Sequence, residues 1–111
     1  MGNKNLFIIK KFLKYIEKIF AYRGDCEFSE FVADEKLAEA CVFNLIQIGE
    51  LVRRLDDEFK EAHPQIHWGS IYNLRNRIVH DYEGIDFEII WDIIANDLPA
   101  LKLQFTAIKG E

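Results

Sequence analysis

The chain has little cysteine, no long apolar run and no excess of positive charge. Its two cysteines, Cys26 and Cys41, are too few and too unpatterned for a disulfide framework or a cysteine-based zinc site. With no recognisable signal peptide, the sequence favours a reducing, cytoplasmic compartment. Charged residues interrupt the apolar stretches well before the roughly 20 residues that a membrane-spanning helix needs. We therefore expect a cytoplasmic protein without a membrane segment.

The shortage of positive charge limits the kinds of partner. Lys and Arg number 14 against 19 Asp and Glu, giving a net charge of -5 and a pI near 5.2. Non-specific nucleic-acid binding depends on many Lys and Arg that neutralise phosphates, so a general nucleic-acid coat is excluded and no DNA binding is expected. Any RNA contact must be local. The candidates are two arginine pairs, Arg53 with Arg54 and Arg75 with Arg77.

Apolar and aromatic residues, in contrast, are abundant. The 111 residues are 50% hydrophobic and 14% aromatic. This length suits one domain with one modest core, so we expect a single helical domain over residues 1–111. The aromatic excess indicates an aromatic-rich core, an apolar surface kept for a partner subunit, or both.

Apolar residues recur in steps of three and four, the period of amphipathic α-helices. This period predicts a first helix over about residues 4 to 22, stopped by Gly24. It also predicts a longer helix over about residues 33 to 61, which starts at Asp34 and ends before Pro64.

Two further helices are predicted in the second half of the chain. The third is short, is expected to extend to His80, and is terminated by Gly84. The fourth starts with Asp86 as its N-cap and is expected to kink where Pro99 removes a hydrogen bond. No segment shows the alternation of apolar and polar residues that would predict a β-strand. The predicted fold class is all-α, an up-and-down four-helix bundle with a short third helix and a proline-kinked last helix.

One segment, residues 75–82, brings together a cation, an amide, an imidazole and a phenol; it reads Arg75-Asn76-Arg77-Ile78-Val79-His80-Asp81-Tyr82 and is called the motif segment below. Arginine holds a phosphate through two parallel charge-assisted hydrogen bonds, and histidine transfers protons near neutral pH. Phosphodiester cleavage needs both. The alternative is a solvated or paired arginine and a histidine that caps carbonyls at a helix end.

The spacing within the motif segment has a geometrical consequence. On an ideal helix five residues turn by about 140°, so Arg75 and His80 of one chain would point apart. Either the helix unwinds before His80 or two copies of the segment meet across a symmetric dimer. Asn76, four residues before His80, would share its face and orient the imidazole. Arg77, about 200° from Arg75, is expected to face solvent.

Four blocks of sequence carry a family resemblance. They are Asn44-Leu45-Ile46-Gln47-Ile48-Gly49-Glu50, Pro64-Gln65-Ile66-His67-Trp68, the motif segment, and Trp91 followed by Asn96-Asp97-Leu98-Pro99. In this order, over most of the chain, they resemble the HepT-like toxins of the HEPN superfamily. The Arg-x-x-x-x-His core is shared by many HEPN proteins, whereas the trailing tyrosine and the Ile-Gly-Glu and Asn-Asp-Leu-Pro blocks are more specific.

The resemblance implies a homodimeric four-helix toxin with metal-independent ribonuclease activity and no cofactor. In such families a small nucleotidyltransferase antitoxin of the MNT type adenylylates the motif tyrosine, which corresponds to Tyr82. The expected mechanism makes His80 a general base or acid and has Arg75 hold the phosphate of a single-stranded RNA.

Other polar residues allow more than one interpretation. Glu50 either supports the motif segment or belongs to a solvated helix face. The adjacent Gly49 is expected to permit close helix contact, because glycine inside a helix is otherwise unfavourable. His63 and His67 are spaced like two metal ligands, but Pro64 lies between them and no third ligand is near, so no metal site is expected.

Two competing functions remain open. The chain could be a non-catalytic subunit that binds a nucleotide or substrate for a separate nucleotidyltransferase, with Arg75 and His80 on the phosphate. It could also be a bare dimerisation module. Assays of RNA cleavage and of nucleotide binding distinguish the ribonuclease, the nucleotide-binding subunit and the dimerisation module.

Overall fold

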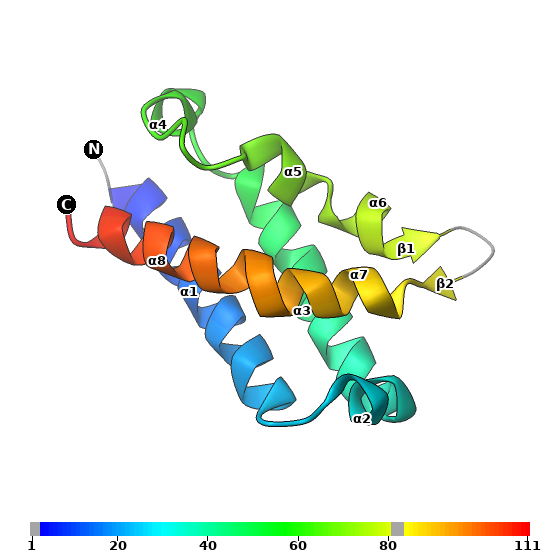
Figure 1. Ribbon diagram of the computed structural model, residues 1–111. Helices are drawn as coiled ribbons and strands as arrows, with labels where there is room; N and C mark the ends of the chain where they lie inside the picture. The colour runs from blue at the N-terminus through cyan, green and yellow to red at the C-terminus, as the bar shows by residue number, and fades with distance from the viewer. Residues whose placement is uncertain (1–2, 81–83) are drawn as a thin grey trace.

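The computed structural model describes residues 3–80 and 84–111, and these are almost wholly helical (Figure 1). In chain order the elements are α1 (Asn3–Arg23), α2 (Phe28–Ala33), α3 (Glu35–Val52), α4 (Asp57–Glu61), α5 (Trp68–Tyr72), α6 (Leu74–Ile78), β1 (Val79–His80), β2 (Gly84–Ile85), α7 (Phe87–Asp92), the π-helical turn η1 (Ile93–Asp97) and α8 (Leu98–Lys109). The all-α fold class predicted from the sequence is confirmed.

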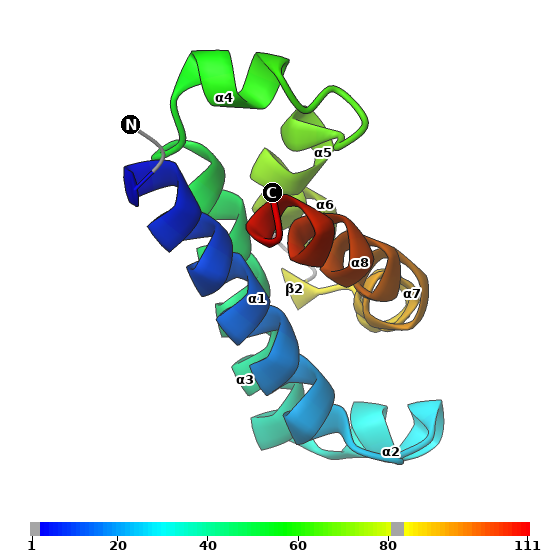
Figure 2. The ribbon, with the colours of Figure 1, turned by 90° about the vertical axis from the view of Figure 1, so that its left-hand side faces the viewer.

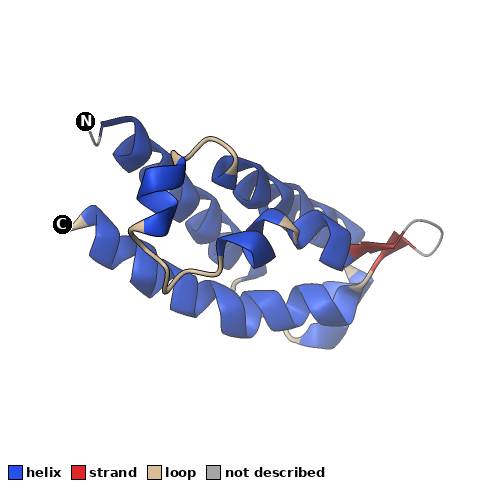
Figure 3. Cartoon of the chain, turned by 90° about the horizontal axis from the view of Figure 1, so that it is seen from above, coloured by secondary structure: helices blue, strands red, loops and turns tan. Residues whose placement is uncertain are grey.

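Helices α1 and α3 lie side by side, and the run of α7, η1 and α8 crosses them (Figures 1 and 2). The β1–β2 hairpin projects at the end of the molecule opposite to the two chain ends (Figure 3). Within the residues that the structure describes, no helix combines the length and apolar character needed to cross a membrane.

The core is rich in aromatic residues, as the composition suggested. Phe12 of α1 stacks on Phe105 of α8 with ring centroids 4.6 Å apart. Ile16 of α1 and Leu45 and Ile48 of α3 have no exposed surface. The core therefore joins helices that are far apart in the sequence.

The first helix has nearly the predicted bounds, and its end has the predicted cause. Gly24 follows α1 with a φ of 54°, a left-handed conformation that glycine adopts without steric cost. Its backbone N–H donates to the Phe20 carbonyl over 2.9 Å. Asp34 caps α3 as predicted, because its carboxylate accepts from the Leu37 N–H at 3.0 Å.

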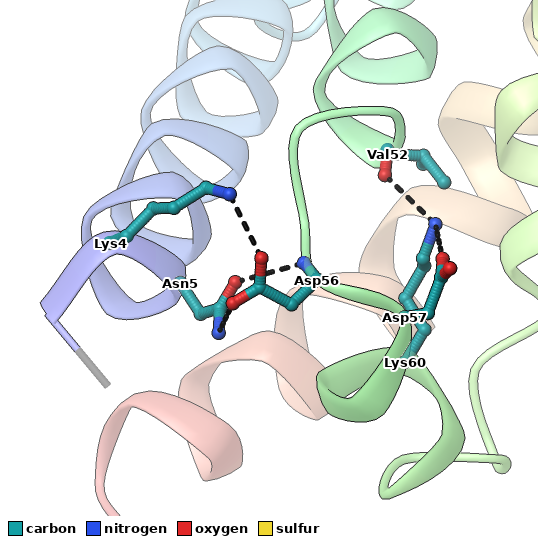
Figure 4. A network of polar contacts seen from close by, with 6 residues as sticks. All are labelled: Lys4, Asn5, Val52, Asp56, Asp57 and Lys60. Atoms are coloured by element: carbon teal, nitrogen blue, oxygen red, sulfur yellow. Dashed lines mark hydrogen bonds and ion pairs between the residues drawn. The ribbon is translucent and has the colours of Figure 1, made fainter. Parts of the chain in front are cut away.

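The single helix predicted over residues 33 to 61 is wrong: α3 ends at Val52, and α4 is separate. The break is held by Asp56, whose backbone N–H donates to the Asn5 side chain over 3.2 Å. Asn5 and Lys4 in turn donate to the Asp56 carboxylate over 3.1 and 2.9 Å (Figure 4). These partners lie about fifty residues away in α1, so helical periodicity could not reveal them.

The short helix α2 was not predicted. It has a capping box in which the Glu27 and Glu30 side chains each accept from the backbone of the other residue. Its one fully enclosed side chain is Phe31, which packs against Trp91 at 5.3 Å between ring centroids. Six residues are too few to give a clear apolar period.

The predicted third helix is also corrected. It consists of α5 and α6, joined at Asn73, and it ends at Ile78 instead of continuing to Gly84. The chain then forms a short antiparallel hairpin in which Val79 pairs with Ile85 and His80 with Gly84. Gly84 has a φ of 78°, so its conformational freedom serves the hairpin and not a helix end.

The last helix accommodates Pro99 through a change in hydrogen-bonding pattern. Residues Ile93–Asp97 form a π-helical turn, and Pro99 is the second residue of the α-helix that follows. Proline is tolerated in a first helical turn, and π-turns are one of the established causes of irregularity in a helix. Asp86 is the N-cap of α7, as predicted, and its carboxylate accepts from the Ile89 N–H at 3.1 Å.

Candidate functional site: the motif segment

Two side chains of the motif segment stand free on α6. Arg75 and Asn76 are exposed, and neither forms a hydrogen bond or an ion pair with another described residue. An arginine on a helix surface is often neutralised by a carboxylate three or four residues away. Among the residues that the structure describes, no carboxylate pairs with this guanidinium.

The helix unwinds before His80, which was one of the two geometries that the sequence left open. Val79 has φ -115° and ψ 117°, an extended conformation. The Ile78 carbonyl accepts from the Asp86 N–H over 2.9 Å, so the hairpin takes up a helical carbonyl. His80 consequently lies on β1, and the 140° divergence from Arg75 does not apply.

The same change removes the expected relation between Asn76 and His80. They were predicted to share a helical face, but the helix that would align them ends at Ile78. Tyr82, the expected site of modification, and the neighbouring Asp81 lie outside the described residues.

The angular position of Arg77 on the helix had indicated that it faces solvent. It is instead partly covered and paired. Its Nη2 lies 3.4 Å from Oδ2 of Asp97, with 38% and 42% of the two side chains exposed. The pair links α6 to η1. Sequence reasoning gave Asp97 no role beyond its place in the Asn-Asp-Leu-Pro block, which was the only available signal.

Two hollows meet at Arg77. A groove of about 390 Å³ lies between the segment with α5 and α6 and the run of η1 and α8; it is lined by Gln65, His67, Ser70, Ile71, Leu74, Arg77, Ile93, Asp97, Leu98, Ala100, Leu101 and Gln104. A more open hollow of about 500 Å³ is lined by Asn76, Arg77, Glu88, Ile89 and Asp92. Arg77 thus forms a wall shared by both.

Glu50 lies on α3 with its carboxylate 3.3 Å from Nη1 of Arg53, and 56% of the Glu50 side chain is exposed. This partner belongs to the end of its own helix and not to the motif segment. Support of the motif segment by Glu50 stays a prediction.

The two histidines considered as metal ligands lie in different environments. His63 is buried, its Nδ1 donates to the Phe59 carbonyl over 2.9 Å, and its Nε2 lies 3.3 Å from the Glu111 carboxylate. His67 is exposed. Across residues 3–80 and 84–111 no group of three His, Cys, Asp or Glu side chains is arranged to hold a metal ion.

The titratable groups with shifted pKa values lie outside the motif segment. Burial, and to a lesser extent Cys26, raises the pKa of the Cys41 thiol to about 11. Hydrogen bonds from Lys4 and Asn5 lower the pKa of Asp56. The raised pKa of Cys41 favours a protonated, unreactive thiol. The hydrogen bonds to Asp56 stabilise the connection between α1 and α4.

Comparison with known proteins identifies the family of the chain. Residues 12–108 match a family model described as "Ribonuclease HepT-like". A candidate RNase of Methanocaldococcus jannaschii is 38% identical over 87 residues, which cover 78% of this chain and 72% of that protein. A protein of Thermococcus cleftensis named for ribonuclease HepT activity is 31% identical over 94 residues, covering 85% of this chain and 86% of the relative. No solved structure gives a significant match.

Fold and site together define an all-α protein of the HEPN type, with an Arg-x-x-x-x-His segment at a helix end. Within that class, the chain belongs to the HepT-like family of ribonucleases. The family match includes the whole motif segment and the Asn-Asp-Leu-Pro block.

Proposed function

We propose that this chain is the toxin of a type VII-like HEPN/MNT toxin–antitoxin pair, a metal-independent endoribonuclease that is silenced by adenylylation of Tyr82. The observation that carries the proposal is the exposed Arg75 on α6, which pairs with no other residue that the structure describes, within a chain that matches a ribonuclease family through the same segment. The ending of α6 at Ile78 is compatible with the proposal, because the divergence of about 140° expected on a continuous helix does not apply to a residue on β1.

In the proposed reaction the ribose 2′-oxygen attacks the adjacent phosphorus, and a P–O2′ bond forms as the P–O5′ bond breaks. His80 accepts the proton of the 2′-hydroxyl or supplies one to the departing 5′-oxygen. Arg75 binds the non-bridging oxygens and stabilises the charge that builds on them. The products are a 2′,3′-cyclic phosphate and a 5′-hydroxyl, and a single-stranded substrate reaches the required in-line geometry more readily than a stacked duplex.

Dimerisation now rests on one of its two original grounds. Because the helix unwinds before His80, the divergence of about 140° between Arg75 and His80 on an ideal helix no longer requires a second copy. The expected apolar surface remains as a ground, and exposed apolar side chains support it, among them Phe7, Phe43 and Leu103 with 55%, 60% and 75% of their surface exposed. Light scattering at micromolar concentration should give a dimer, and a strict monomer would contradict this part of the proposal.

The proposed regulation places a bulky, negatively charged nucleotide on Tyr82, two residues after His80. With an MNT-type nucleotidyltransferase and ATP, the intact mass of the chain should rise by one or more adenylyl groups, with loss of RNA cleavage. Tyr82→Phe should still cleave RNA but resist this silencing. Undiminished adenylylation of the Phe variant would place the modification on another residue.

The competing function is a non-catalytic subunit that binds a nucleotide for a separate nucleotidyltransferase. The exposed Arg75 guanidinium would suit that role as well, since arginine binds any phosphate. Incubation of the purified protein with total cellular RNA separates the two. Cleavage that His80→Ala abolishes supports the ribonuclease, whereas nucleotide binding without cleavage supports the subunit.

A further inference from the structure

A hollow of about 310 Å³ lies beside the motif segment, where α5 meets the end of α3; it is lined by Val52, Arg53, Lys60, Trp68, Gly69 and Tyr72. It shares no lining residue with the two hollows that meet at Arg77. The volume is near the lower end of the range for small-molecule sites, which suits one nucleotide unit better than a large ligand.

The back of this hollow is rigid. The Trp68 Nε1–H donates to the carbonyls of Lys60 and His63, each over 3.1 Å, which fixes the ring in place. The Lys60 ammonium donates to the Val52 carbonyl over 3.4 Å and lies 3.5 Å from the Asp57 carboxylate (Figure 4). Ligand contacts are therefore left to the side chains at the rim.

Tyr72 and Arg53 form the rim. Tyr72 has 47% of its surface exposed, and its hydroxyl makes no hydrogen bond with another described residue. The Arg53 side chain is 63% exposed, with one contact to Glu50 at 3.3 Å. Such an exposed ion pair contributes little to stability, so the guanidinium can readily exchange the carboxylate for a phosphate.

The rim is continuous with Arg75. Asn73 joins α5 to α6; its N–H donates to the Gly69 carbonyl, and its own carbonyl accepts from the Arg77 N–H. The Cα atoms of Tyr72 and Arg75 lie within about 11 Å because only three residues separate them. A base on Tyr72 and a phosphate on Arg75 would thus belong to the same short stretch of RNA.

We propose that Tyr72 and Arg53 form a subsite for one nucleotide of single-stranded RNA, next to the phosphate that Arg75 holds. The base stacks on the Tyr72 ring, and Arg53 contacts a backbone phosphate. Aromatic stacking is tolerant of sequence, and proteins that bind single strands combine it with cations placed along the path of the backbone. This inference rests on the proposed ribonuclease function and names a second point at which the same substrate is bound.

Gly69 offers a sharp electrostatic probe of the subsite. A Cβ atom at this position would meet no heavy atom within 4 Å, so a small side chain fits without displacing the fold. Gly69→Asp and Gly69→Asn differ only in charge. Gly69→Asp should therefore weaken the binding of a labelled uridine octamer by about fivefold relative to Gly69→Asn, as expected for one added charge near a phosphate.

Tyr72 is tested with the same octamer by fluorescence anisotropy. Tyr72→Ala should weaken binding by about tenfold, whereas Tyr72→Phe should stay within about twofold of the wild type, because it keeps the ring. Tyr22→Ala is the matched control, since Tyr22 is a tyrosine of similar exposure, 45%, at the end of α1. It should leave binding unchanged.

The outcomes separate this subsite from the ribonuclease proposal. Equal affinity of the two Gly69 variants, or of Tyr72→Ala and Tyr22→Ala, would overturn the subsite even if the wild type cleaves RNA. Loss of binding in Gly69→Asp and Tyr72→Ala with no cleavage by the wild type would uphold RNA binding here and refute the ribonuclease. Unchanged RNA binding with weakened antitoxin binding would make the hollow a protein contact and overturn the inference.

Discussion

Gly49 of α3 lies in direct backbone contact with Ile71 of α5: a Cβ atom on Gly49 would be 2.9 Å from the Ile71 carbonyl oxygen and 3.3 Å from that of Tyr72. The close helix contact that this glycine was expected to permit is therefore present. Because α6 follows α5 after a single residue, this contact also positions Arg75 and Asn76 relative to α3.

Gly49→Ala should destabilise the protein and reduce RNA cleavage, because α5 must move away from α3 to make room for the methyl group. Overpacking of this kind costs about 1 to 3 kcal/mol, more than the roughly 1 kcal/mol that alanine gains over glycine inside a helix. Urea denaturation measures the change. Gly69→Ala is the control and should be neutral or stabilising by up to about 1 kcal/mol, since its methyl group meets nothing within 4 Å and alanine is favoured over glycine in a helix. A Gly49→Ala variant more stable than the wild type would show that the two helices are not in tight contact.

The Arg77–Asp97 pair should contribute a small coupling between α6 and η1. We expect a double-mutant cycle of Arg77→Ala and Asp97→Ala to give about 0.2 to 1 kcal/mol, because the pair is partly exposed. Cleavage by Arg77→Ala should fall less than cleavage by Arg75→Ala, since Arg77 acts through the position of the helix. Equal losses in the two arginine variants would instead indicate general electrostatic binding of RNA.

The tether between α1 and α4 should depend on pH. Hydrogen bonds from Lys4 and Asn5 lower the pKa of Asp56, so its contribution to stability is complete above the unfolded-state pKa, near 4, and is lost as the pH falls through the lower folded-state pKa. Asp56→Asn should therefore be less stable than the wild type at neutral pH, with the difference shrinking in acid. Thermal unfolding across a pH series measures it, with Asp57→Asn as the control. A difference that stays constant down to about pH 2 would contradict the assignment.

Cys41 should be unreactive in the folded protein. It has no exposed surface, and burial raises the pKa of its thiol to about 11, so little thiolate is present even in mildly alkaline solution. Iodoacetamide at pH 8 to 9 should leave Cys41 unmodified until the chain is unfolded in urea. Peptide mass spectrometry locates the label, and rapid labelling of native Cys41 would indicate that α3 opens locally.

Features set by neighbouring residues were the ones that the sequence could predict. The left-handed Gly24, the capping residues Asp34 and Asp86, and the helix-wide apolar period all act over a few residues, and each occurs as expected. The break after Val52 depends on Asn5, half the chain away, so no local pattern contains it.

The candidate site shows the same contrast between features that the sequence predicts and features that depend on distant residues. Residue chemistry and family resemblance were enough to select Arg75 and His80, but not to predict that the helix ends at Ile78, because the Ile78 carbonyl accepts from Asp86, the residue that follows β2. The solvent-facing role expected for Arg77 was wrong because Asp97, on another element, lies within reach.

The most direct test of the central claim is RNA cleavage by the purified protein in the presence of EDTA. Total cellular RNA is incubated with the wild type, Arg75→Ala, His80→Ala and Lys14→Ala, the last as an exposed cation control on α1. The account predicts cleavage by the wild type and by Lys14→Ala that leaves 2′,3′-cyclic phosphate ends, and a loss of about a hundredfold or more in the other two variants while they stay folded. Undiminished cleavage by His80→Ala, or cleavage that EDTA abolishes, would contradict it.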